Sequence, residues 1–167
     1  MNIENVDLAE SITIEPDTSL VLSGAGVRKK FMYKIYIAAL YLTKKVRTAE
    51  EAILNTGPKR ILFHYLYDKV AVERLIDGWR DGFKSNMNEE EHSELASQIE
   101  KFLGLLEDAY KGDITVIDYT KNGEVEVWLN EERKGVIKGA ELYKSILKVL
   151  IGDCPVDDQM KNAILCQ

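Results

Sequence analysis

Cysteine is scarce in this sequence, and both copies, Cys154 and Cys166, lie near the C-terminus. Their spacing matches none of the patterns in which cysteines hold a metal ion, and His64 and His92 are remote from them in the chain. No metal site is therefore expected. The cysteines are interpreted as two ordinary thiols, with a disulfide left open for an oxidising compartment.

Long apolar runs are also missing. None reaches the roughly 18 to 20 residues that a membrane-spanning helix needs. The longest candidate, Tyr33–Leu42, contains Lys34 and is rich in strand-forming residues. The N-terminus, MNIENVDLAESITI, has neither the basic start nor the apolar stretch of a secretory signal. We expect no integral membrane segment, in a protein that either stays in the cytoplasm or is a mature form whose Met1 replaces a removed signal.

Positive charge is in the minority, with 22 Lys and Arg against 28 Asp and Glu and a formal net charge of −6. This balance argues against a nucleic-acid-binding protein, because such proteins carry a basic stripe. The one basic cluster, residues 28–30, is too short to follow a phosphate backbone. The sequence has no Ser-His-Asp order, no phosphate-binding loop and no dinucleotide fingerprint, so no cofactor is expected.

Strand patterns are present along much of the chain, whose 167 residues suit a single domain, 1–167, with a sizeable core. Alternation of apolar and polar residues with a period of two predicts these strands. Asn122-Gly123 predicts a tight hairpin between two of them. The predicted strands are 11–14, 20–22, 29–42, 61–67, 113–119, 124–129 and 136–138.

Helix signals occupy the remaining segments. Thr48 with Glu51, and Asn88 with Glu91, have the spacing of residues that cap a helix start. Apolar stripes of helical period follow. The predicted helices are 48–55, 72–83, 88–111, 142–150 and 157–165. Antiparallel strands interrupted by a block of helices predict an α+β fold, with one curved antiparallel sheet and helices packed on one face.

The stretch from Leu20 to Leu42 is the most informative part of the sequence. We interpret Gly24-Ala25-Gly26 as a sharp turn that leads through Arg28-Lys29-Lys30 into the apolar strand. Glycine has no Cβ, so its backbone turns sharply or approaches a ligand closely. A cationic cluster at the mouth of an apolar strand can neutralise an anionic group whose apolar remainder is buried further in.

This stretch resembles the Gly-x-Gly-x-Arg turn of the chalcone isomerase-fold family. Further pieces follow in the family's order over about residues 11–165, namely 24–28, 36–42, 57–61, 78–83 with Asn86, and 152–157. The set is most similar to the bacterial chalcone isomerase-like branch, whose members often carry a signal peptide. The resemblance implies an open-faced β-sandwich fold, and a periplasmic location with the cytoplasm as the alternative.

The plant enzymes of this family close a ring by adding a phenolate to an enone, and an arginine stabilises the oxyanion. The resemblance places that arginine at Arg28 and an accompanying lysine at Lys69, which would be the catalytic residues of an intramolecular lyase. The enzymes' threonine falls at Tyr36, their tyrosine at Leu66 and their asparagine at Glu73. These departures argue against a cyclase.

Other members of the family bind fatty acids, and the resemblance implies that the same arginine holds the carboxylate. Arginine suits a carboxylate because its planar fork donates two parallel hydrogen bonds. We therefore predict non-catalytic binding of a small hydrophobic carboxylate, with its tail between the sheet and a helix; the alternatives are a lyase acting on a phenolic ligand and an interaction module. The aromatic residues among the candidates also suit a plain core. The predicted ligand-binding residues are Arg28, Lys30, Tyr36, Tyr65, Trp79 and Phe83.

Overall fold

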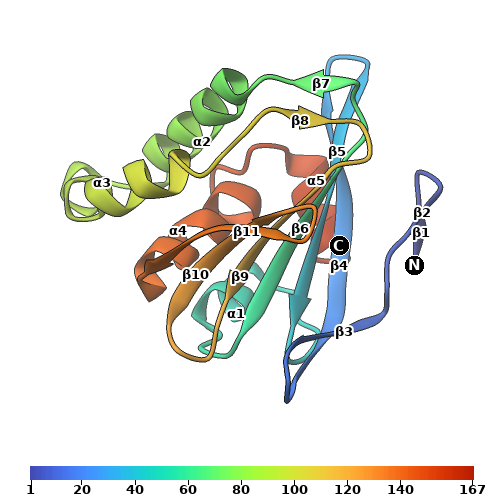
Figure 1. The fold of residues 1–167 in the computed structure, drawn as a ribbon, viewed down its shortest axis with the longest axis horizontal. Helices are drawn as coiled ribbons and strands as arrows, with labels where there is room; N and C mark the ends of the chain where they lie inside the picture. Colours follow the sequence, from blue (N-terminus) through green and yellow to red (C-terminus); the bar gives the residue numbers. More distant parts are fainter.

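One antiparallel sheet of seven strands forms the frame of the molecule (Figure 1), as seen in the computed structural model, which describes residues 1–167. The order across the sheet is β11-β10-β9-β6-β5-β4-β3. The strands are β3 (Ser11–Glu15), β4 (Thr18–Lys30), β5 (Tyr33–Leu42), β6 (Lys59–Tyr65), β9 (Ile114–Tyr119), β10 (Glu124–Leu129) and β11 (Glu132–Lys138). The sheet is curled, and the predicted α+β class is confirmed.

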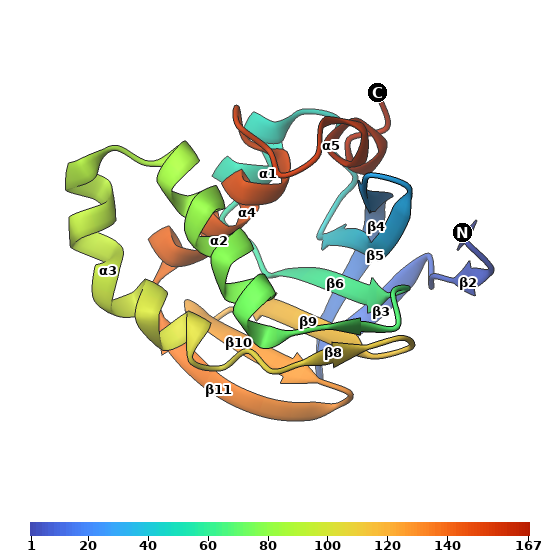
Figure 2. The same cartoon turned by 90° about the horizontal axis from the view of Figure 1, so that it is seen from above.

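The helices gather on one side of this sheet, as Figure 2 shows. They are α1 (Ala49–Leu54), α2 (Val72–Asn86), α3 (Glu89–Leu103), α4 (Ala140–Ile151) and α5 (Asp158–Ile164). None of them combines the length and the apolar character needed to cross a bilayer. Four strands of two residues each form two separate small sheets; they are β1 (Asn2–Ile3) with β2 (Val6–Asp7), and β7 (Lys69–Val70) with β8 (Ala109–Tyr110).

Both faces of β5 are buried, which explains why its sequence is apolar almost throughout. Ala38 and Leu40 belong to the main core between the sheet and the helices. Ile37 and Tyr41 belong to a smaller core on the opposite face, which Leu8 of the N-terminal segment helps to cover. The first side is the helix face of the sheet, and the second is its outer face.

The predicted turn at Gly24-Ala25-Gly26 is wrong, because these residues lie in the middle of β4. The chain reverses instead at Phe31 and Met32, a two-residue loop between the paired residues Lys30 and Tyr33. The predicted strand 29–42 is therefore two strands. The alternation continued through the loop without a visible break, and neither loop residue is a usual turn former, so the sequence concealed the reversal.

The glycines of β4 allow a helix to approach, not a ligand. A Cβ atom on Gly24 would lie 1.9 Å from the backbone oxygen of Ile164, and one on Gly26 would lie 2.6 Å from the backbone oxygen of Met160. Both oxygens belong to α5. Gly24 and Gly26, which are two residues apart and face the same side of β4, therefore let α5 lie directly on the sheet.

Among the other predicted element boundaries, two differ from the structure by four residues or more. Helix α3 ends at Leu103 and not near residue 111, because the following segment leaves the helix to form β8 beside β7. Strand β11 begins at Glu132 and not at residue 136, because the turn lies at Asn130-Glu131, where both residues have positive φ. Its first residues are charged because β11 is an edge strand exposed to solvent.

Lys59, at the start of β6, is a buried cation with no carboxylate partner. It is 3% exposed, its Nζ donates to the carbonyl oxygen of Gly57 at 3.0 Å, and the same atom lies 4.9 Å from the ring centre of Tyr119. Burial, helped by the nearby charge of Lys144, lowers the pKa of Lys59 from 10.5 to about 8. The buried charge therefore costs stability at neutral pH.

This lowered pKa gives the protein a characteristic pH dependence. Between about pH 8 and 10.5 the folded protein has lost the Lys59 proton while the unfolded chain still binds it, so the stability contributed by Lys59 rises with pH. Urea unfolding at several pH values should show that Lys59→Met flattens this rise, by up to about 3 kcal/mol. Parallel pH profiles for the wild type and the variant would contradict the assignment.

Candidate functional site

Three predicted residues form a row across adjacent strands at one end of the sheet. Arg28 on β4 lies directly opposite Tyr36 on β5, which in turn lies opposite Tyr65 on β6. Residues that face each other in this way share one face of a sheet with their Cβ atoms about 4.5–5.5 Å apart. Tyr36 and Tyr65 belong to the main core, so the row lies on the helix face. A bulge between Arg28 and Lys29 sets this register.

The guanidinium of Arg28 is held by the segment that leads into α5. Its Nη1 donates to the carbonyl oxygen of Val156 at 2.8 Å. Next to it, Asp157 accepts from the backbone N–H of Lys29 at 3.1 Å and from that of Met160 at 2.9 Å, so its carboxylate caps α5. Arg28 itself forms no ion pair. It is a half-buried cation that keeps several N–H donors without a protein acceptor.

Tyr36 differs from Tyr41 and Tyr143, two other buried tyrosines of this protein. The hydroxyls of Tyr41 and Tyr143 each donate to a backbone carbonyl, at 3.0 Å and 2.8 Å. The hydroxyl of Tyr36 forms no such bond. Every fully buried side-chain oxygen in the structure has a hydrogen-bond partner, so this hydroxyl is not fully buried. It therefore reaches solvent, although the side chain as a whole is buried. The hydroxyl is therefore free to bond a ligand.

The row supplies proton donors at neutral pH. Burial raises the pKa of Tyr36 to about 12; the charge of Arg28 opposes this shift and that of Asp157 adds to it. Burial also raises the pKa of Tyr65, with a smaller contribution from Tyr36. Both hydroxyls stay protonated near pH 7. Together with Arg28 they form a positive, hydrogen-bond-donating end of the interior, which suits an anion.

An aromatic cluster continues from this row to the helices. Ring centres of Tyr36 and Tyr65 are 5.8 Å apart, those of Tyr36 and Phe63 are 5.1 Å apart, and those of Phe63 and Trp79 are 6.1 Å apart. Trp79, half-buried on α2, stacks on Phe83 at 5.8 Å. The structure thus brings together Tyr36, Tyr65, Trp79 and Phe83, as one wall of the interior beside Arg28.

Two members of this cluster were absent from the predicted site. Phe63 links the sheet to Trp79, and Phe102 of α3 touches Trp79 with ring centres 5.2 Å apart. Phe63 lies two residues before Tyr65, so the period of the strand already places it on the same face. Phe102 belongs to the apolar stripe of its helix, but no local pattern shows which partner that stripe meets.

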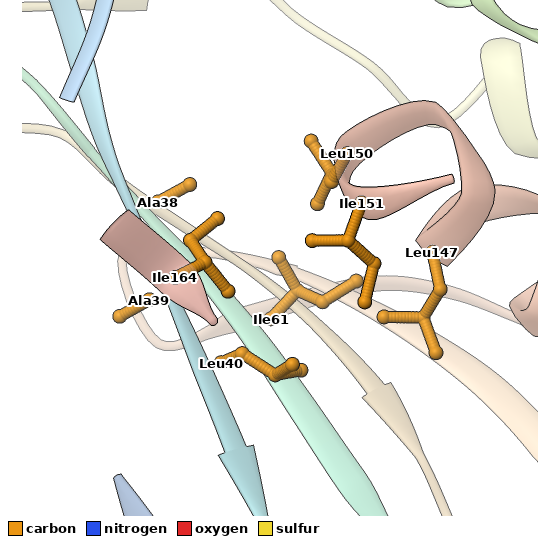
Figure 3. A pocket seen from close by; sticks show the side chains of 8 residues that line it. All are labelled: Ala38, Ala39, Leu40, Ile61, Leu147, Leu150, Ile151 and Ile164. Atoms are coloured by element: carbon orange, nitrogen blue, oxygen red, sulfur yellow. The ribbon is translucent and has the colours of Figure 1, made fainter. Parts of the chain in front are cut away.

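A small apolar cavity lies between the sheet and helices α4 and α5 (Figure 3), and none of the predicted ligand-binding residues lines it. Its volume is about 10 Å³, which is close to the space of one water molecule. Ala38, two residues after Tyr36 on the same face of β5, is part of its wall. An acyl chain would need neighbouring side chains or helices to move apart. The cavity is lined by Ala38, Ala39, Leu40 and Ile61 of the sheet, Leu147, Leu150 and Ile151 of α4, and Ile164 of α5.

The remaining candidates lie outside the row. Lys30 is exposed at the end of β4, and its side chain forms no hydrogen bond or ion pair. Lys69, on β7, lies 3.8 Å from a carboxylate oxygen of Asp108 and 5.7 Å from the ring centre of Tyr110. The charge of Lys69 is therefore already close to a carboxylate. Glu73 is exposed in the first turn of α2.

Leu66, where the resemblance placed the enzymes' tyrosine, and the predicted ligand-binding residue Tyr65 lie on opposite faces of the sheet. Leu66 packs against the smaller core on the outer face, whereas Tyr65 faces the helices beside Tyr36. Tyr65, and not Leu66, is therefore the residue of this segment whose ring lies beside Tyr36.

Cys154 and Cys166 are free and exposed, and no group of three or more His, Cys, Asp or Glu side chains converges anywhere in the structure.

Comparisons with known proteins agree with this architecture. The sequence matches the family described as chalcone isomerase-like over residues 1–166. No curated protein matches the sequence. Among solved structures, the fold is similar to that of a fatty-acid binding protein from Arabidopsis thaliana, with a TM-score of 0.68, 17% identity, and coverage of 93% of this chain and 96% of that chain. At this identity the likeness shows a shared fold, and the site must be argued from its own residues.

Proposed function

The chain belongs to the chalcone isomerase-like family, and from this premise we propose that it binds a small amphipathic carboxylate, such as a fatty acid, without transforming it. One observation carries the proposal. Arg28 is a half-buried cation without a carboxylate partner, and it lies opposite Tyr36, whose protonated hydroxyl is also without a partner.

The head group would be held by charge-assisted hydrogen bonds. A carboxylate has two acceptor oxygens, which fit the parallel N–H donors of a guanidinium. The Tyr36 hydroxyl adds a neutral donor from the next strand, and Tyr65 closes the row. A buried carboxylate without such partners would be very costly, so the ligand must place its charge at this end.

The tail would follow the helix face away from Arg28. The next position on β5 toward the interior is Ala38, a small residue that faces Gly26 on β4. The space over Gly26 is occupied by the backbone of α5, so the room at this point is the water-sized cavity whose wall includes Ala38, and the tail would have to widen it. Trp79 and Phe83 form the aromatic wall on the α2 side. Sites for such ligands are mostly apolar with a few polar anchors.

The Arabidopsis thaliana protein of the same fold binds fatty acids according to its name, which supports this assignment. The isomerase alternative has less support, because Leu66 faces away from the row and Lys69 lies beside Asp108. The bacterial and periplasmic origin implied by the resemblance stays a prediction, which the genomic start of the gene would test.

The head-group assignment predicts that affinity depends on the charge of the ligand. Displacement of a fluorescent fatty acid should require at least about tenfold more of a primary alcohol than of the fatty acid with the same chain, because the alcohol forms no charge-assisted bond with Arg28. Equal displacement by the two compounds would contradict the proposal. Cyclisation of a chalcone that disappears in Arg28→Ala would favour the lyase instead.

A further inference from the structure

The tip of the β4–β5 hairpin is the most exposed apolar feature of the molecule. Phe31 is 92% exposed and Met32 is 89% exposed, more than any other large apolar side chain. Directly behind them, Tyr33 and Tyr67 are exposed and lie edge to face, with ring centres 5.5 Å apart. The hairpin reaches the upper end of the molecule in Figure 1. Four aromatic or apolar side chains thus form one projecting wedge.

Neither folding nor packing explains the residues at this tip. Phe31 has a φ of +58°, a left-handed conformation in which a bulky residue is strained. Two-residue hairpin loops with positive φ at the first position normally carry glycine there. Burial of the Phe31 side chain does not offset this strain, because almost all of its surface faces solvent. We therefore infer that the Phe31 side chain contacts a partner outside the folded domain.

Positive charge surrounds the apolar tip in a protein whose net charge is −6. Lys29 and Lys30 precede it, are exposed and form no side-chain ion pair. Lys34 follows it and pairs with Glu4 at 2.7 Å. The tip thus combines an apolar wedge with two unpaired lysines immediately behind it.

We propose that this hairpin docks the protein on the surface of an anionic phospholipid bilayer. Phe31 and Met32 would enter the acyl region, and the tyrosine pair behind them would lie at head-group depth, where amphipathic rings are favoured. Lys29 and Lys30 would meet the anionic phosphates. In a bilayer the apolar acyl region lies beneath the anionic head groups, which matches the order of apolar and cationic residues along the hairpin. An apolar groove on a protein would not require lysines around the apolar tip.

Docking at the tip would bring the head-group site to the membrane. Arg28 precedes Phe31 by three residues of nearly extended chain, a distance of about 10 Å. A fatty acid could then pass between the bilayer and the row of Arg28 and Tyr36. This exchange role rests on the proposed function, but the docking itself does not.

Sedimentation with sucrose-loaded vesicles tests the docking without any fatty acid. The wild type is expected to bind vesicles containing phosphatidylserine at least about tenfold more strongly than vesicles of phosphatidylcholine alone, and to lose this preference at high salt. Phe31→Gly/Met32→Ser should lose vesicle binding. Lys29→Glu/Lys30→Glu should lose the phosphatidylserine preference.

Matched variants separate docking from general effects. Leu54→Ser removes an exposed leucine on α1 and Lys44→Glu/Lys45→Glu reverses two exposed lysines beyond the other end of β5; both should bind vesicles like the wild type. Phe31→Gly relieves the positive φ and should raise Tm by about 2–4 °C while vesicle binding falls. Stability and docking would then change in opposite directions, which a structural role for Phe31 does not predict.

Several outcomes would overturn the proposal. These are wild-type binding that ignores phosphatidylserine, hairpin variants that bind like the wild type, and control variants that lose as much. Dimerisation through Phe31 and Met32 without vesicle binding would assign the tip to a second copy of the chain. Fatty-acid displacement that continues while vesicle binding is absent would remove the docking and leave the proposed function intact.

Discussion

Replacing Arg28 with alanine is expected to weaken fatty-acid binding by about 100-fold, the loss that follows when a buried carboxylate is deprived of its charged partner. Arg28 is the half-buried cation of the site, and the only hydrogen bond of its side chain within the protein goes to the carbonyl oxygen of Val156. Displacement of a fluorescent fatty acid measures the change directly.

Conservative and distant variants make this test specific. Arg28→Lys keeps the charge but loses the planar fork, so its affinity should fall between those of the wild type and Arg28→Ala. Arg74→Ala removes an exposed arginine of α2 and should change nothing. Thermal unfolding must show that Arg28→Ala still folds, since its bond to Val156 is lost as well. Unchanged affinity in a folded Arg28→Ala protein would remove Arg28 from the site.

Replacing Gly24 with alanine is expected to destabilise the protein by about 3 kcal/mol or more, at the upper end of what an added methyl group costs in a packed core. The new Cβ would lie 1.9 Å from the backbone oxygen of Ile164. A helix backbone cannot yield as a flexible side chain does, so α5 must move away from β4. The same movement would disturb Val156 and Asp157, which position the Arg28 end of the site.

Gly78→Ala is the matched control for this substitution. A Cβ on Gly78 would meet nothing within 4 Å, and the residue is exposed inside α2. Alanine there should stabilise the protein by about 0.5–1 kcal/mol, because glycine is a poor helix former. Urea unfolding of both variants gives the comparison. A Gly24→Ala protein as stable as the wild type would show that α5 does not rest on β4 in this way.

Local signals in the sequence were sufficient for most of the fold. Thr48 accepts from the backbone N–H of Glu51 and caps α1, and Asn88 caps α3 in the same way, as the residue spacing predicted. The predicted hairpin between β9 and β10 is present, but its loop runs from Thr120 to Gly123 and only Gly123 has a positive φ, so the type I′ turn expected at Asn122-Gly123 is wrong. Each of these features depends on residues only a few positions apart, which is the range over which sequence patterns carry information.

The errors have a common physical cause in long-range contacts. Gly24 and Gly26 are glycines because α5, some 130 residues later in the chain, lies on them. Phe31 occupies a turn position without a turn former, so the reversal left no local sign. The two-residue strands β7 and β8 are too short to show any period, and they exist only as a pair.

The candidate site was predicted in part for the same reason. Arg28 and Tyr36 were identified from the motif and the strand period, and the structure places them opposite each other. The sequence could not show that Tyr65, and not Leu66, faces the site. This depends on the register of β6, which is defined only by its pairing with β5. Arg28 forms no ion pair although Asp157 lies beside the next residue, and this depends on how α5 is placed, so no sequence pattern could reveal it.

Native mass spectrometry of the purified protein, followed by denaturing extraction, tests the central claim most directly. The proposed function predicts a non-covalent adduct that extracts as a fatty acid from the wild type and is lost or strongly reduced in Arg28→Ala. A protein that carries no such adduct and does not take up added fatty acids would contradict it.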